Sequence, residues 1–220
     1  MKSLYESILG STHAGKASII KAWLDEHNIK NYTINSKGEV DVDGDVNLSG
    51  RGLTEFPSFI QFGTVKGNFF YNNNNLTTLK GAPKKVGRSF ECSYNKLTSL
   101  KGAPNEVGGS FDCSFNNLIS LEGAPNVVNG YFDCSTNKLT SLKGAPRGVG
   151  GSFNCRNNKL TTLEGAPEKV GDWFHCDNNR LTSLEGAPKE ANYFNCEKNT
   201  TKFSKKDVRE VCKVEKKIYV

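Results

Sequence analysis

Long apolar runs are absent from this sequence of 220 residues, in which 36% of the side chains are apolar. A transmembrane helix needs about 20 consecutive, mostly apolar residues, so we expect no membrane span. The first ten residues, MKSLYESILG, lack the basic stretch and following apolar stretch of a secretory signal. The sequence therefore predicts one soluble protein in a reducing cytoplasm.

Residues that commonly carry catalysis or bind metals are few. Histidine occurs three times, at His13, His27 and His175, and none has a serine or cysteine partner at the spacing of a catalytic motif. Cysteine pairs of the form C-x-x-C, which build tetrahedral zinc sites, are also missing. We therefore expect no enzyme: no catalytic residues, no metal site and no cofactor.

The chain instead repeats itself about every 21 residues. Five cysteines follow one another at steps of 21 residues, and a sixth comes 20 residues later. These six are Cys92, Cys113, Cys134, Cys155, Cys176 and Cys196. A phenylalanine precedes each by two residues and an asparagine follows by three, so the unit reads F-x-C-x-x-N-x-L-x-x-L-x-G-A-P plus a short variable stretch. Such self-similarity predicts stacked coils that share one core.

Each part of the unit predicts a local structure. In F-x-C, two inward side chains lie two residues apart on one face of an extended strand, and the residue between them faces solvent. The asparagine turns the chain, and its amide can bond the backbone or stacked copies of itself. L-x-x-L returns along the core, and Gly-Ala-Pro forms the next corner. About 21 residues per coil leave no room for a helix of typical length.

The cysteines occupy a packing position. Earlier coils place Leu48 and Tyr71 in the same register, and a position that accepts leucine, tyrosine and cysteine is a core position. Stacked strands lie about 4.8 Å apart, so geometry leaves disulfides open. The total of seven cysteines is odd, and together with the missing signal this favours free, buried thiols.

The unit resembles the leucine-rich repeat family, L-x-L-x-x-N-x-L-x-x-L, with phenylalanine and cysteine in place of the two strand leucines. It is most similar to the short repeats of bacterial effectors, although Gly-Ala here precedes the proline, and to repeats of uncharacterised bacteriophage proteins. The resemblance covers residues 46–203. It implies an α+β repeat fold, a curved solenoid whose parallel strands line a concave face that binds other proteins. It also implies a bacterial host cytoplasm.

Segments outside the repeat predict caps. We expect an N-terminal helical and hairpin cap over residues 1–45, the solenoid over 46–203 and a C-terminal helical cap over 204–220. The first cap contains helices over 3–9 and 17–27, the second with Ile19, Ile20, Trp23 and Leu24 buried, and a hairpin turn at 35–38. In the last cap, Ser204 followed by Asp207 marks a helix start, and KIYV adds a strand.

The outward strand positions predict a protein-binding site. Aromatic residues gather before the later strand phenylalanines, and the strands themselves are acidic. The predicted partner-binding residues of the concave face are Asp112, Tyr131, Asp133, Arg156, Trp173, His175, Asp177 and Tyr193. They suit a protein with basic and apolar surface, whereas nucleic-acid phosphates would be repelled. The alternative interpretation is that Trp173 and Tyr193 cover a thinning core.

The leading hypothesis is a non-catalytic protein that binds and inhibits or sequesters another protein. By resemblance, it is a bacteriophage or mobile-element protein acting on a host factor. One alternative is a structural or assembly scaffold. Another is nucleotide binding through residues 10–16, GSTHAGK, a near match to the phosphate-binding loop in which Ala17 replaces the required hydroxyl. The sequence does not indicate the oligomeric state.

Overall fold

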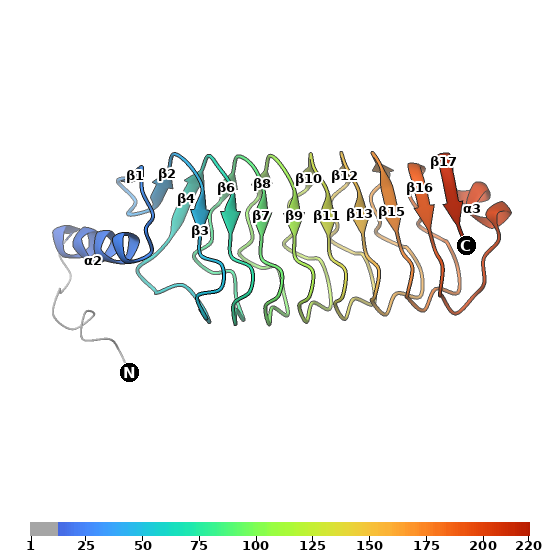
Figure 1. The fold of residues 1–220 in the computed structure, drawn as a ribbon, viewed down its shortest axis with the longest axis horizontal. Coiled ribbons are helices and arrows are strands. Elements are labelled where there is room, and N and C mark those ends of the chain that lie inside the picture. The colour runs from blue at the N-terminus through green and yellow to red at the C-terminus, as the bar shows by residue number, and fades with distance from the viewer. Residues whose placement is uncertain (1–12) are drawn as a thin grey trace.

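A computed structural model describes residues 13–220. Figure 1 shows an elongated, nearly straight stack of coils, with helix α2 (His13–Glu26) at one end and α3 (Lys205–Val211) at the other. The described residues form about nine turns of a solenoid with a period of about 21 residues. Among them, no helix combines the length and apolarity needed to cross a membrane.

Each coil contributes the predicted F-x strand to a column of parallel strands. The column comprises β3 (Val46–Asn47), β5 (Phe69–Phe70), β7 (Phe90–Glu91), β9 (Phe111–Asp112), β11 (Phe132–Asp133), β13 (Phe153–Asn154) and β15 (Trp173–His175). Equivalent residues face each other, as Phe111 pairs with Phe132 and Asp112 with Asp133. The spacing of the repeat therefore appears directly as sheet register, which confirms the predicted parallel strands.

A second column of strands lies in the stretch that the sequence analysis treated as variable. It comprises β4 (Phe62–Val65), β6 (Lys85–Val86), β8 (Glu106–Val107), β10 (Val127–Val128), β12 (Gly148–Val149) and β14 (Lys169–Val170). The signal is a buried valine four residues before each strand phenylalanine, as in Val107 and Phe111. The repeat pattern predicted the F-x-C strand, and this second column was missed.

The two columns merge at the coil that is one residue short. Two residues, Gly171 and Asp172, separate β14 from β15, whereas Asn192 alone stands between the corresponding positions of the next coil. Without the extra residue the chain runs through as one strand, β16 (Glu190–Asn195), which pairs with both β14 and β15. The final strand, β17 (Lys213–Tyr219), continues this pattern beside β16.

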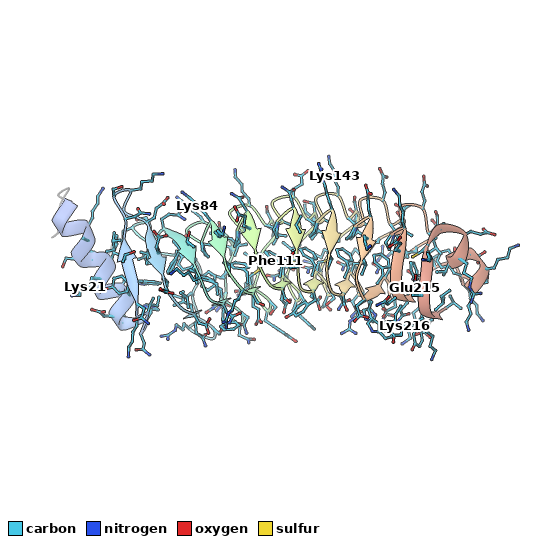
Figure 2. All side chains as sticks on the ribbon, turned by 90° about the horizontal axis from the view of Figure 1, so that it is seen from above. Lys21, Lys84, Phe111, Lys143, Glu215 and Lys216 are labelled. Atoms are coloured by element: carbon cyan, nitrogen blue, oxygen red, sulfur yellow. The ribbon has the colours of Figure 1, made fainter. Side chains whose placement is uncertain are left out.

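Stacked side chains fill the core. The phenylalanine rings of neighbouring coils lie parallel, with centroids 5.4 Å apart for Phe90 and Phe111 and 5.3 Å for Phe111 and Phe132. Figure 2 shows Phe111 inside the stack, while Lys84 and Lys143 project from one long side and Lys216 from the other. Burying a side chain of this size contributes about 1.5–3 kcal/mol, so each added coil extends a continuous apolar core.

The asparagine of each unit holds its turn together. The Nδ2 of Asn116 donates to the carbonyls of Cys92, Cys113 and Ser114 at 3.0, 3.2 and 3.1 Å. Its Oδ1 accepts from the Leu97 amide of the preceding coil at 2.9 Å. The predicted turn role is confirmed, although these bonds go to backbone groups of two adjacent coils rather than to stacked asparagine side chains.

The described caps follow their local sequence signals. Helix α2 buries Ile19, Ile20, Trp23 and Leu24, as predicted. Strands β1 (Tyr32–Ile34) and β2 (Val40–Val42) form the expected antiparallel hairpin. At the other end, Ser204 and Asp207 make both bonds of a capping box before α3. The helix expected over residues 3–9 lies outside the described residues.

Candidate protein-binding face

The predicted binding residues lie along the outward side of the F-x column, which we call the strand face. Six of them occupy strand positions or the position just before a strand, while Arg156 and Asp177 directly follow the strand cysteines. Sheet register places Asp112 beside Asp133, and Trp173 beside Tyr193. The structure therefore divides the predicted residues between an acidic part and an aromatic part of one face.

The acidic part consists of Glu91, Asp112 and Asp133, which we call the acidic ladder. They occupy the same register position on three neighbouring strands, and such strands lie about 4.8 Å apart. Burial and the neighbouring charge of Asp112 raise the pKa of Glu91. Burial, and more weakly Asp133, raises the pKa of Asp112 despite bonds from Ser114. The ladder thus holds like charges together at an energetic cost.

Two further side chains, Tyr131 and Asn154, interact with the acidic ladder. Burial and the charges of Asp112, Glu91 and Asp133 raise the pKa of Tyr131 to about 12. On the other side, Asn154 donates from Nδ2 to Asp133 Oδ2 at 2.9 Å. Glu91 is not among the predicted binding residues, but sheet register places it beside Asp112.

The aromatic part is a set of parallel rings centred on Trp173, which we call the aromatic stack. Trp173 stacks on Tyr193 with ring centroids 4.3 Å apart and planes at 9°. Its ring also lies 4.9 Å from that of His175 and 5.4 Å from that of Tyr219. Lys216 lies over the Tyr193 ring, with its Nζ 5.1 Å from the centroid. The Tyr193 ring therefore has the Trp173 ring stacked against it and the Lys216 ammonium over it.

The aromatic stack lies outside the core. Phe174 and Phe194 fill the core positions of these coils, whereas Trp173 and Tyr193 neither belong to the described core cluster nor pack against it as partly buried side chains. This arrangement argues against the interpretation that they cover a thinning core. Tyr219 was missed from the sequence because the last coil departs from the repeat, although β17 places Ile218 in the phenylalanine position and Tyr219 in the outward one.

One polar contact links the stack to the end of its strand. His175 Nδ1 lies 3.7 Å from Asp177 Oδ1. That oxygen is buried and finds no hydrogen-bond partner among the described residues. Arg156 is exposed and occupies the same repeat position one coil earlier.

The near match to a phosphate-binding loop does not form a loop where it is described. Gly15 and Lys16 lie within α2, and residues 10–12 lie outside the described part. Helix α2 runs through these positions because it begins at His13, four residues before the start of the helix expected over 17–27. Lys16 instead lines a groove of about 720 Å³ with Lys37 and Phe59. Within residues 13–220, no cluster of metal-ligating side chains is present.

Parallel strands at a period of about 21 residues, asparagine-bonded turns and inward L-x-x-L segments together define the architecture. The fold is a leucine-rich repeat solenoid. No family model and no curated protein matches the sequence. Among solved structures, YopM from Yersinia enterocolitica WA-314 is similar, with a TM-score of 0.40 and 15% identity over 84% of this chain. The match covers 55% of the YopM chain, so this solenoid spans about half of its length.

Proposed function

We propose that this chain is a non-catalytic recognition module that holds another protein against the strand face. The observation that carries the proposal is the placement of the acidic ladder and the aromatic stack on one face of one sheet. Burial, and more weakly the neighbouring carboxylates, raise the pKa of Glu91 and Asp112, and the stack leaves large rings outside the core. Both arrangements lie outside the apolar core cluster, and both suit binding.

The chemistry of the face defines the partner. A lysine or arginine placed against Asp112 relieves the repulsion within the ladder, so the same contact favours binding and removes an internal cost. Apolar groups suit the partly exposed Trp173 and Tyr193 side chains, which are residue types that often dominate binding energy. The proposed partner is a protein surface with basic and apolar side chains. Nucleic acid is disfavoured because its phosphates would meet the carboxylates.

The proposed biological setting rests on the residue pattern of the repeat. Its resemblance to phage-borne repeats supports a bacteriophage or mobile-element protein that inhibits or sequesters a host factor in the bacterial cytoplasm. A protein that inhibits by binding needs a surface that competes with the natural ligands of the host factor. It does not need a catalytic group.

A pull-down with paired variants tests the proposal. Tagged protein is incubated with bacterial lysate alongside Trp173→Ala/Tyr193→Ala and Asp112→Asn/Asp133→Asn variants, and retained proteins are identified by mass spectrometry. We expect a partner retained by the unaltered chain and reduced at least tenfold by either pair of substitutions. Val127→Ala is the matched control because Val127 is 57% exposed on the other strand column.

The outcomes separate the surfaces. A partner that depends on the acidic ladder and the aromatic stack but not on Val127 supports the strand face. Equal retention by every variant would show that the partner binds elsewhere on the chain. Binding of the purified partner, measured by calorimetry, should weaken with rising salt because opposite charges meet across the interface.

A further inference from the structure

Two aromatic side chains occupy a backbone position that disfavours them. The residue before the asparagine that holds each turn has a left-handed backbone, with φ between +51° and +55°. These residues are Asn73, Tyr94, Phe115, Thr136, Asn157, Asn178 and Lys198. Asparagine adopts this conformation readily, whereas a bulky side chain there is an outlier. Tyr94 and Phe115 thus introduce backbone strain that asparagine avoids at the same position of three other coils.

Core packing does not explain the pair. Tyr94 is 51% exposed and Phe115 39%, and their rings stack on each other with centroids 4.2 Å apart and planes at 8°. Ile119, in the same coil as Phe115, is 62% exposed. In the other regular coils threonine occupies the position of Ile119. Two adjacent coils therefore carry three exposed large apolar side chains, and we call the ring pair of Tyr94 and Phe115 the turn platform.

The turn platform borders a hollow with one charged side chain. Tyr94, Phe115 and Thr136 line a space of about 460 Å³ together with Lys96 and the turn asparagines of three coils. Lys96 is the single charged residue along this lining among the described residues. Residues 93–98, 114–119 and 135–140 contain two lysines, Lys96 and Lys138, and no aspartate or glutamate. The hollow thus combines ring faces with positive charge, opposite in sign to the acidic ladder.

We propose that the turn platform is a second protein-binding site. It accepts a peptide segment in which a large apolar side chain stands next to a carboxylate: the apolar group packs on Tyr94 and Phe115, and the carboxylate pairs with Lys96. This site is independent of the strand face. A single-stranded nucleic acid fits less well, because its phosphate chain would run toward Asp112, which lies three residues before Phe115 and accepts from the Ser114 amide at 2.9 Å.

Selection from a random peptide library provides the test. A phage-displayed library of 12-residue peptides is panned on the full chain, and synthetic copies of the enriched peptides are titrated by fluorescence anisotropy. We expect enriched sequences that pair an aromatic or large aliphatic residue with aspartate or glutamate. Their binding should weaken at least tenfold in Tyr94→Asn/Phe115→Asn and several-fold in Lys96→Ala. Asparagine is suited to both positions because equivalent coils already contain it.

Controls separate this site from the strand face and from a structural role. Trp173→Ala/Tyr193→Ala and Lys143→Ala should leave peptide binding unchanged. The melting temperature of Tyr94→Asn/Phe115→Asn should equal or exceed that of the unaltered chain, since the strain at the two positions is relieved.

Three results would overturn the proposal. One is the absence of any peptide whose binding depends on Tyr94 and Phe115. A second is a melting temperature several degrees lower in Tyr94→Asn/Phe115→Asn, because the ring pair would then be a stabilising element. The third is a fluorescent 12-nucleotide thymidine oligomer that binds the unaltered chain but not this variant, which would assign the platform to single-stranded nucleic acid.

Discussion

At the scale of single residues, the repeated cysteine is a small core side chain with a polar tip. Cys113 Sγ donates to the Asp133 carbonyl of the next coil at 3.3 Å, and Cys134 and Cys155 make the same bond. All seven cysteines are free and buried. Burial raises the pKa of the Cys113 thiol far above its usual range, so the reactive thiolate is suppressed. The repeated thiols serve packing, because Leu48 and Tyr71 occupy the same repeat position in earlier coils.

Tyr71 fills the cysteine position with a hydroxyl that has nothing to bond. Its side chain is fully buried against Phe56, and its oxygen finds no partner among the described residues. We expect Tyr71→Phe to raise the free energy of unfolding by about 1 kcal/mol, since an unsatisfied buried hydroxyl is removed. Urea denaturation followed by circular dichroism measures the change. A loss of stability would mean that the hydroxyl has a partner.

The glycine of each Gly-Ala-Pro corner combines a left-handed backbone with close contact to the preceding coil. At Gly144, φ is +89°, and an added Cβ would lie 2.6 Å from the Glu122 nitrogen. We expect Gly144→Ala to lower the free energy of unfolding by about 1–3 kcal/mol. Gly148→Ala is the control, because it has ordinary φ and no atom within 4 Å of the added carbon. Similar denaturation midpoints for the two variants would contradict this explanation.

At the scale of strands, the acidic ladder makes stability depend on pH. The folded state raises the pKa of Glu91 and Asp112, so it binds their protons more tightly than the unfolded chain does. These two groups therefore cost nothing at low pH, and their cost grows as pH rises from about 4 through the raised pKa values. The ladder is least favourable at neutral pH, where a cationic partner would offset it.

Asp112→Asn tests this strand-scale effect. We expect a gain of about 0.2–1 kcal/mol in unfolding free energy at pH 7, typical of removing like charges from adjacent strands, and no gain at pH 3. Asn154 shows that asparagine fits the position, since its Oδ1 accepts from the Arg156 amide at 3.2 Å. Denaturation curves across this pH range provide the measurement. A gain that persists unchanged at pH 3 would point to packing instead of charge.

The sequence predicts those strands whose residues repeat in every coil and misses those with weaker signals. F-x-C and the asparagine recur together, so the first strand column and the turns follow from spacing. In the second column only a valine recurs, and strands of two residues show no alternation. Tyr94 and Phe115 escaped notice because their repeat position also holds asparagine, threonine and lysine, and a left-handed backbone is not visible as spacing. Tyr219 lies where the repeat itself is lost.

At the scale of the whole molecule, each coil is stabilised by contacts with its two neighbours, so the coils at both ends need caps over their exposed apolar side. Val208, Cys212 and Ile218 of the C-terminal cap are buried against the last coil. Deleting residues 204–220 would expose Phe194 and the edge of β16, and exposed sheet edges pair with other chains. We expect the shortened protein to elute as oligomers, measured by size-exclusion chromatography with light scattering. A shortened chain that remains monomeric would show that β16 closes the stack unaided.

The constant register of the coils also sets how far apart the two parts of the strand face lie. One coil, carrying Asn154, separates Asp133 of the acidic ladder from His175 of the aromatic stack. Inserting or deleting a whole coil there would change this separation in steps of about 4.8 Å while leaving each part intact. The solenoid thereby acts as a molecular ruler, in which the number of coils selects partners by the distance between their basic and apolar groups.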